Sequence, residues 1–246
     1  MDRRMSRSLN IAEVPAALLA GGRATRLGKI VQDLPKALLD IAGRPFIDHQ
    51  MRLLRRNGIR RVVLCLGHLG EQIQRHLGDG SAFDLQLDYS YDGDRLLGTG
   101  GAIRAALDKL GDVFWVMYGD SYMDIDYPAI LAHFDRSGAS ALMTVLQNNK
   151  QWDTSNVRFE NGRLLRYDKA HPAADMNHID YGAALLRREV FADVPPGQAF
   201  DLADLYSRLV AEHRMIGYEV TRRFYEIGTA ASLEETRRHF QSRSEK

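Results

Sequence analysis

A short stretch near the N-terminus, LLAGGRATRLGKIVQDLPKALL, brings glycines and cations together directly after an apolar run. The run is typical of a buried strand, and the Gly21-Gly22 step after it lets the backbone turn around a ligand that a Cβ atom would exclude. Arg26 and Lys36 follow. A guanidinium can hold two phosphate oxygens, and an ammonium can neutralise a leaving pyrophosphate. The spacing therefore fits a nucleoside triphosphate, although spacing alone also leaves a solvated basic loop open.

Several other phosphate and cofactor motifs are missing from the sequence. GGRATR departs from the dinucleotide-binding pattern G-x-G-x-x-G, because Ala24 stands at the second glycine position. Nothing matches the Walker pattern G-x-x-x-x-G-K-[ST], the serine hydrolase elbow G-x-S-x-G or the zinc motif H-E-x-x-H. These absences disfavour a nicotinamide-binding domain, a hydrolase and a zinc site.

A carboxylate follows a second apolar run, in VFWVMYGDSYMDID. Asp120 comes just past the end of this run, where an α/β crevice can present a metal ligand. We interpret Asp124 and Asp126 as exposed loop or helix-capping residues. Cys65, in RVVLCLG, is predicted to be buried and not a nucleophile, which suits a reducing cytoplasm.

Strand-like runs alternate with amphipathic stretches through the first half of the chain, which predicts β-α units around a largely parallel sheet. The carboxyl ends of its strands would form the ligand crevice. The predicted strands are Val14–Ala20, Arg61–Gly67, Leu85–Tyr91, Val113–Tyr118 and Ala141–Gln147, and the predicted helices are Pro45–Asn57, Glu71–Leu77, Gly101–Leu110 and Tyr127–Ser137.

The second half of the chain has a different pattern. NVRFENGRLLRYD predicts a hairpin that turns at Asn161-Gly162. We expect a strand at Ile179–Leu186 and helices at Leu202–Glu212 and Ala231–Ser242.

Composition and charge restrict the class of protein. The chain has 246 residues, of which 45% are hydrophobic and 26% charged, and its formal net charge is +1. This balance is typical of a soluble protein and provides no overall field that would attract nucleic acid or an anionic membrane. The apolar runs are far shorter than the roughly 20 residues that cross a bilayer. We therefore expect a cytoplasmic protein that has neither nucleic acid nor a membrane as a partner.

The ordered motifs resemble those of the sugar-1-phosphate nucleotidylyltransferases, and among them the short heptose-1-phosphate guanylyltransferases. The stretch from Leu19 to Leu27, with Pro35-Lys36, is similar to the family signature L-A-G-G-x-G-T-R-L followed by P-K, and LLGTGGAI resembles its G-T-x-G-A segment. This resemblance implies nucleotide contacts from Leu19, Ala20, Gly21, Gly22, Arg23, Thr25, Gly98, Thr99 and Gly100.

The same resemblance implies metal, sugar and catalytic residues. Asp120 matches the family's metal-binding aspartate, and Glu226 in FYEIGT stands where the family carries a second one, so both are expected to hold Mg²⁺. The segments that approach the sugar phosphate would supply Gly119, Asp168, Lys169, Asp180 and Gly182. The expected catalytic residues are Arg26, Lys36 and Lys169.

The resemblance also implies a Rossmann-like three-layer α/β/α fold with a mostly parallel mixed sheet and a small β insertion. We predict a single nucleotidyltransferase domain over residues 12–242. Its nucleotide-binding half would span 12–147 and its sugar-phosphate-binding half 148–242, with flexible tails at 1–11 and 243–246.

The implied reaction joins a nucleoside triphosphate and a sugar 1-phosphate to give an NDP-sugar and pyrophosphate, with Mg²⁺ as the cofactor. GTGGAI together with IAGRPF is most similar to enzymes that activate D-glycero-D-manno-heptose 1-phosphate with GTP for capsule or lipopolysaccharide synthesis. Transfer of a uridylyl, cytidylyl or thymidylyl group to another sugar or polyol phosphate, and a catalytically silent nucleotide-sugar sensor, are the alternatives. Assembly into a homo-oligomer is left open.

Overall fold

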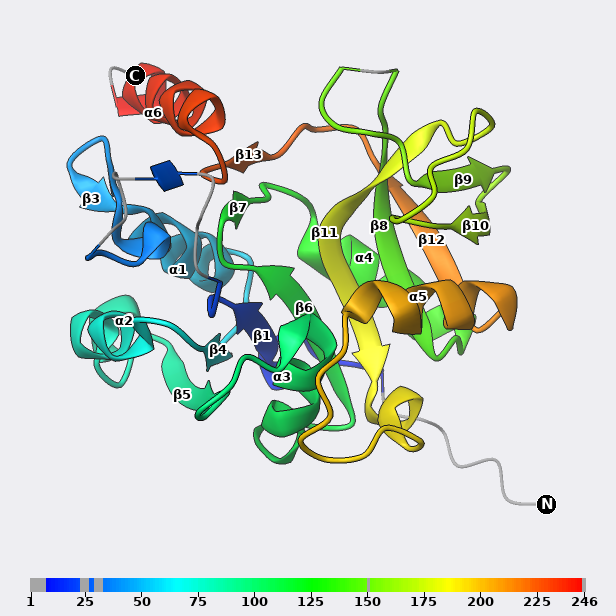
Figure 1. Cartoon of the computed structure of the whole chain (residues 1–246), viewed down its shortest axis with the longest axis horizontal. Helices are drawn as coiled ribbons and strands as arrows, with labels where there is room; N and C mark the ends of the chain where they lie inside the picture. Colours follow the sequence, from blue (N-terminus) through cyan, green and yellow to red (C-terminus); the bar gives the residue numbers. More distant parts are fainter. Residues whose placement is uncertain (1–7, 23–26, 29–32, 150, 245–246) are drawn as a thin grey trace.

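A mixed nine-stranded sheet forms the centre of the computed structural model, which describes residues 8–22, 27–28, 33–149 and 151–244. Seven strands lie side by side in the order β5-β4-β1-β6-β11-β8-β12 (Figure 1). Only β11 runs antiparallel to both of its neighbours, β6 and β8, within this described row. The strands are β1 (Ala16–Leu19), β4 (Arg61–Leu66), β5 (Gln86–Tyr91), β6 (Val113–Tyr118), β8 (Ala141–Gln147), β11 (His178–Arg187) and β12 (Met215–Val220).

Helices cover both faces of this sheet, because the central strands are apolar on both sides. In β1, Ala16 and Leu18 belong to one core and Ala17 to the other. The first core is covered by α1 (Phe46–Arg56), α2 (Gly70–Leu77) and α4 (Tyr127–Ser137), and the second by α3 (Gly98–Ala106) and α5 (Leu202–Ala211). In Figure 1, α5 lies in front of β11 and α4 behind it. The predicted three-layer α/β/α fold is confirmed.

The last helix, α6 (Ala230–Ser244), adds a smaller third core outside α1. Leu233 and Phe240 of α6 pack there with Phe46 and Leu53 of α1. Short 3₁₀ helices complete the helical structure at η1 (Ile11–Glu13), η3 (Lys36–Leu38), η4 (Ser81–Phe83), η5 (Leu107–Lys109) and η6 (Arg188–Phe191). None of the described helices is long and apolar enough to span a membrane.

Three small antiparallel pairs lie outside the row of seven strands, and one of them, β9-β10, extends the same sheet beside β11. The predicted hairpin is present as β9 (Val157–Glu160) and β10 (Arg163–Tyr167), and both of its turn residues, Asn161 and Gly162, have positive φ. That geometry is the two-residue turn that suits the twist of paired strands. The other pairs are β2 (Asp40–Ile41) with β3 (Arg44–Pro45), and β7 (Ser121–Tyr122) with β13 (Tyr225–Glu226).

Differences from the sequence prediction fall mostly at the ends of elements. The α3 helix begins at Gly98 instead of Gly101, and its last turn is the 3₁₀ helix η5. Asp126 caps α4 by accepting a hydrogen bond from Ala129 N, as predicted. Cys65 is buried, and burial raises the pKa of its thiol to about 12, so it is not a ready nucleophile. The strand β12 was not predicted.

Candidate active site

A pocket of about 240 Å³ opens where β1, β4 and β6 end, at the carboxyl edge of the sheet. Ligands of open α/β sheets bind at this edge, because the loops after parallel strands diverge there. The pocket is lined by Leu19, Gly21, Gly22, Lys36, Cys65, Asp92, Leu96, Gly98, Thr99, Ala102, Tyr118 and Asp120. Seven of these were predicted as site residues from the sequence, namely Leu19, Gly21, Gly22, Lys36, Gly98, Thr99 and Asp120.

The two glycines after β1 have different surroundings. A Cβ atom on Gly21 would lie 2.9 Å from the backbone nitrogen of Gly67, so only glycine allows the ends of β1 and β4 to approach this closely. A Cβ atom on Gly22 would meet nothing within 4 Å. Gly21 therefore shapes the pocket wall, whereas Gly22 leaves open space beside it. Arg23, Thr25 and Arg26 lie outside the described residues.

Lys36 and Asp120 form an ion pair at this pocket. Lys36 Nζ lies 2.6 Å from Asp120 Oδ2, and the side chains are 20% and 23% exposed. Lys36 begins η3 directly after Pro35, whereas Asp120 follows β6 by two residues. The hydroxyl of Ser121 donates to the other carboxylate oxygen, Oδ1, at 3.2 Å. The fold thus brings a cation and an anion predicted from separate motifs into direct contact.

Glu226 is brought to the same place by the short β7-β13 pair. It lies opposite Ser121 in that pair, and the backbone N–H of Ile227 donates to the carbonyl of Asp120 at 3.0 Å. Burial raises the pKa of Glu226, and the nearby charge of Asp120 raises it further. Two carboxylates that repel each other in this way are the oxygen donors that a hard divalent cation prefers. The residues present therefore fit a divalent metal.

The described residues contain no group of three or more His, Cys, Asp and Glu side chains that could hold a metal. Asp120 and Glu226 would therefore supply only part of a coordination shell. A metal that keeps several ligands from water or from substrate phosphates, as Mg²⁺ usually does, suits such a site.

Asp168 organises a turn at the end of β10. Its Oδ1 accepts hydrogen bonds from the backbone N–H groups of Ala170 and His171, at 3.1 and 2.8 Å. The bond from His171 is the main reason that the pKa of Asp168 is lowered, and Arg166 at 3.1 Å lowers it further. Lys169 follows within the same turn and is exposed. Asp168 thus holds the segment that presents Lys169 to solvent.

Asp180 and Gly182 lie at an irregularity in β11. The register with β8 shifts between Asp180 and Ala184, and Gly182 has a φ of +100°, which a side chain would disfavour. Asp180 Oδ1 accepts the backbone N–H of Gly182 at 3.0 Å, and burial raises the pKa of Asp180 to about 6. A Cβ atom on Gly182 would lie 3.4 Å from the ring of Tyr118, which lines the pocket. This irregularity places Asp180 near the pocket.

The segment LLGTGGAI forms the start of α3 and packs against the chain that leads into α5. Phe200 O accepts the backbone N–H of Gly100 at 3.0 Å, and a Cβ atom on Gly100 would lie 2.3 Å from the Phe200 ring. Thr99 donates its hydroxyl to Asp201 at 2.9 Å. Gly98 and Thr99 line the pocket, whereas Gly100 has a packing role. Nucleotide contact by these three residues stays a prediction.

Sequence reasoning missed several residues of the pocket. Asp92 directly follows β5 at the same sheet edge, and burial raises the pKa of its carboxyl. Tyr118 is the last residue of β6. Ligands of open α/β sheets bind at the carboxyl ends of the strands, which is how Asp120 was predicted. The same reasoning applied to every predicted strand end would have found Asp92 and Tyr118.

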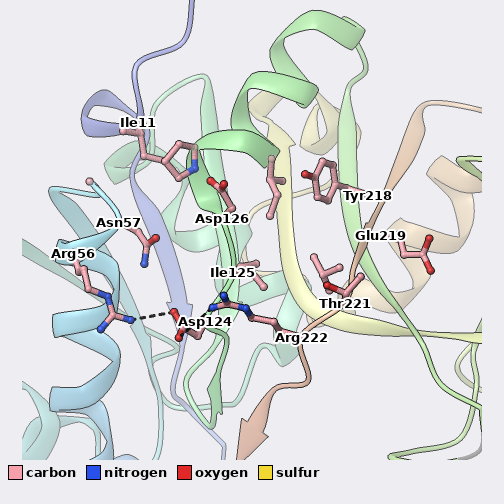
Figure 2. A pocket seen from close by; sticks show the side chains of 14 residues that line it. Ile11, Arg56, Asn57, Asp124, Ile125, Asp126, Tyr218, Glu219, Thr221 and Arg222 are labelled. Carbon is pink, nitrogen blue, oxygen red and sulfur yellow. Dashed lines mark hydrogen bonds and ion pairs between the residues drawn. The ribbon is translucent and has the colours of Figure 1, made fainter. Parts of the chain in front are cut away.

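A larger pocket of about 690 Å³ lies elsewhere and contains none of the predicted site residues (Figure 2). Asp124 stands between two arginines on its wall, 3.0 Å from Arg56 and 3.8 Å from Arg222. Asp124 therefore neutralises part of the cationic charge that an anionic ligand would need there.

Comparison with known proteins identifies the family of this chain. The family described as Nucleotidyl transferase matches residues 16–162, which include the strands around the smaller pocket. An N-acetylmuramate alpha-1-phosphate uridylyltransferase of Neisseria meningitidis is 31% identical over 89% of this chain and 95% of its own length. The chain belongs to the nucleotidyl transferase family. This result confirms the family and the nucleotidyltransferase type of enzyme that the motifs predicted, and such nucleotidyltransferases generally use a divalent metal.

Other relatives in the family differ in the substrates that their names state. A D-glycero-alpha-D-manno-heptose 1-phosphate guanylyltransferase of Campylobacter jejuni is 27% identical over 80% of this chain and 88% of its own length. A UTP--glucose-1-phosphate uridylyltransferase of Synechocystis is 27% identical over 79% of this chain, which spans only 55% of that relative. The crystal structure of HddC from Yersinia pseudotuberculosis shares the fold, with a TM-score of 0.75, 22% identity and coverage of 92% of this chain and 99% of that one.

Proposed function

We propose that this nucleotidyltransferase joins a nucleoside triphosphate to a sugar 1-phosphate. A phosphate oxygen of the sugar 1-phosphate attacks the α-phosphorus, the bond to the bridging oxygen breaks, and pyrophosphate leaves. The observation that carries this proposal is the meeting of Lys36, Asp120 and Glu226 at the carboxyl edge of the sheet. Family membership and the named sugar-1-phosphate transferases among the relatives support it.

The chain needs to supply position and charge more than a base. A phosphate monoester is largely ionised at neutral pH, so the nucleophile carries its own charge, and catalysis rests on alignment and charge neutralisation. Lys36 contacts the phosphates of the triphosphate, Arg26 grips them bidentately, and Lys169 steers the sugar phosphate. Leu19, Gly21, Gly22, Gly98 and Thr99 form the wall against which the nucleotide lies.

Asp120 and Glu226 would hold Mg²⁺ in this account. When bound, the ion neutralises charge on phosphate oxygens and helps to align them. Lys36 already balances the charge of Asp120 at 2.6 Å. The Lys36 ammonium thus lies where it can pair with the Asp120 carboxylate before the phosphates bind and with the phosphates afterwards.

Two substrate pairs have support within this reaction. The motifs GTGGAI and IAGRPF, with the Campylobacter relative, favour GTP and D-glycero-D-manno-heptose 1-phosphate. The Neisseria relative favours UTP and N-acetylmuramate 1-phosphate. Gly119, Asp168, Lys169, Asp180 and Gly182 would line the sugar side in either case.

The setting of the reaction is also part of this proposal. We infer one catalytic domain over residues 12–242 in the cytoplasm, acting in NDP-sugar synthesis for capsule or lipopolysaccharide. The single buried cysteine suits a reducing compartment.

The proposal is tested by measuring pyrophosphate release with Mg²⁺ while pairing each nucleoside triphosphate with each sugar 1-phosphate of a panel. Product with one pair is expected, and mass spectrometry should identify the matching NDP-sugar. Release of pyrophosphate without a sugar phosphate, or no release from any pair, would contradict the proposed transfer.

A further inference from the structure

Two carboxylates and three tyrosines gather around the part of the pocket that Tyr118 and Thr99 line. They come from distant parts of the chain, because β6, β10, β11 and α5 meet there. Figure 1 shows α5 lying across β11, and the chain entering α5 passes α3. Burial raises the pKa values of Tyr118, Tyr167 and Tyr206, and the charges of Asp180 and Asp201 raise all three further. The charge of Asp120 also acts on Tyr118.

Asp180 is held in place by the backbone and by one of these tyrosines. Its Oδ1 accepts Gly182 N–H, and its Oδ2 lies 3.5 Å from the hydroxyl of Tyr167. The backbone N–H of Asp180 donates to Asn156 Oδ1 at 2.9 Å. These three contacts fix where the carboxylate lies relative to Tyr118, the tyrosine that lines the pocket.

Asp201 is held by a reciprocal contact between two helix starts. Its Oδ1 accepts the Thr99 hydroxyl and the backbone N–H of Ala203, both at 2.9 Å. Thr99 in turn accepts the backbone N–H of Leu202 at 2.8 Å. Thr99 lines the pocket, so this contact fixes Asp201 beside it as an exposed carboxylate.

The charged side chains around the pocket have different partners. Lys36 lies on the phosphate side, bound to Asp120. On the other side, Asp180 and Asp201 repel each other, and Lys169 is the described cation whose charge acts on Asp180. Neither carboxylate lines the pocket itself, but Asp201 accepts the hydroxyl of the lining residue Thr99, and Asp180 lies near the lining residue Tyr118. If Lys169 contacts the sugar phosphate as proposed, the sugar lies toward these two carboxylates. An ionised carboxylate only accepts hydrogen bonds, so it binds hydroxyl donors and repels a third anion.

We propose that the sugar is uncharged and donates hydroxyls to the Asp180 side of the pocket, and that Asp180 and Asp201 exclude sugars that carry a carboxylate. This inference rests on the proposed function and names its substrate class. It favours a neutral sugar such as a heptose over N-acetylmuramate, in spite of the higher identity to the Neisseria relative.

The test compares substrates of nearly equal size and different charge. One set is N-acetylmuramate 1-phosphate, its neutral carboxamide and N-acetylglucosamine 1-phosphate. A second set pairs each neutral hexose or heptose 1-phosphate that the enzyme turns over with the corresponding uronic acid 1-phosphate. We expect kcat/KM for each neutral member to exceed that of its acid by at least about tenfold.

Variants then locate the source of this preference. Asp180→Asn and Asp201→Asn each remove one charge with little change of shape, and each is expected to reduce the ratio of neutral to acid kcat/KM by several-fold. Asp175→Asn is the matched control, because Asp175 pairs with Arg158 on the surface and does not touch the cluster. Circular dichroism and melting temperature check that each variant is folded.

The outcomes separate the inference from the proposed function. Turnover of neutral sugars with an equal kcat/KM for their acids would overturn the inference and leave nucleotidyl transfer intact. The same holds if the preference is unchanged in both Asn variants, or if only acidic sugars react. Failure of every sugar 1-phosphate would overturn both.

Discussion

Lys36 Nζ contacts Asp120 Oδ2 at 2.6 Å across 84 positions of sequence. This contact joins η3 to the carboxylate that follows β6, so it links the residue proposed to bind phosphates to the residue proposed to bind metal. Both residues line the pocket. Lys36 can therefore leave Asp120 to bind a substrate phosphate, and Asp120 can leave Lys36 to bind a metal.

Replacing Lys36 with methionine should lower kcat/KM for the triphosphate by about 100-fold or more. The variant removes a positioned charge that stabilises the phosphates, and such groups contribute several kcal/mol of transition-state binding. Pyrophosphate release at saturating sugar phosphate measures the effect. Lys109→Met is the control, because Lys109 is exposed in η5, away from the pocket. Equal losses in both variants would remove Lys36 from the mechanism.

Replacing Glu226 with glutamine should raise the Mg²⁺ concentration needed for half-maximal activity by about tenfold or more, because the amide is a weaker ligand without charge. Glu226→Asp keeps the charge, so its Mg²⁺ concentration for half-maximal activity should be closer to that of the wild type. A Mg²⁺ titration of initial rates distinguishes them, with Glu234→Gln on the surface of α6 as the control. An unchanged Mg²⁺ requirement in Glu226→Gln would show that Glu226 does not bind the metal.

The pH dependence of stability should change in Asp180→Asn. The pKa of Asp180 is about 6 in the folded protein and 3.8 for an ordinary aspartate, so between these values the folded state binds more protons than the unfolded state. The free energy of unfolding therefore falls as pH rises through this window, and the burial cost is fully present above pH 6. Asp180→Asn should be more stable than the wild type above pH 6, and this advantage should shrink toward pH 3.8.

Urea unfolding at a series of pH values measures that difference. Asp175→Asn serves again as the control for loss of a surface charge. A constant difference between Asp180→Asn and the wild type at every pH would mean that Asp180 does not titrate in the window.

Replacing Gly100 with alanine should destabilise the protein by about 1–3 kcal/mol, the usual cost of overpacking. The new Cβ atom would lie 2.3 Å from the ring of Phe200, and the chain leading into α5 would have to move. Gly111→Ala is the control, because a Cβ atom there meets nothing within 4 Å. Thermal unfolding of both variants tests this. Equal melting temperatures for the two variants would show that Phe200 can move away from the new Cβ atom without a loss of stability.

The local sequence pattern correctly predicted those elements whose residues determine their conformation without distant contacts. The Asn161-Gly162 turn is set by residues that accept positive φ, and β6 and α4 have the predicted bounds. The strand β12 was not predicted from the sequence because Gly217 interrupts its apolar pattern. A Cβ atom on Gly217 would lie 2.5 Å from the Phe159 ring. A glycine is therefore needed here because of a tertiary contact, which a local sequence pattern does not show.

The site was predictable where a motif marked it and not where distant elements create it. Lys36 was expected from the Pro35-Lys36 motif after the Gly21-Gly22 turn, and Asp120 from its position just past a strand. The pocket contains both. Nothing in the local pattern relates Thr99 to Asp201, because 102 residues separate them and only the packing of α3 on α5 brings them together. The two-residue pair β7-β13 is likewise too short to show a period.

The most direct measurement is pyrophosphate release with Mg²⁺ from four nucleoside triphosphates, each paired with the 1-phosphates of heptose, mannose, glucose, N-acetylglucosamine and N-acetylmuramate. Turnover of a neutral sugar, lost in Lys36→Met and kept in Lys109→Met, is the predicted result. No turnover in any pair, with no rise in melting temperature on adding any nucleotide, would contradict the proposed nucleotidyl transfer.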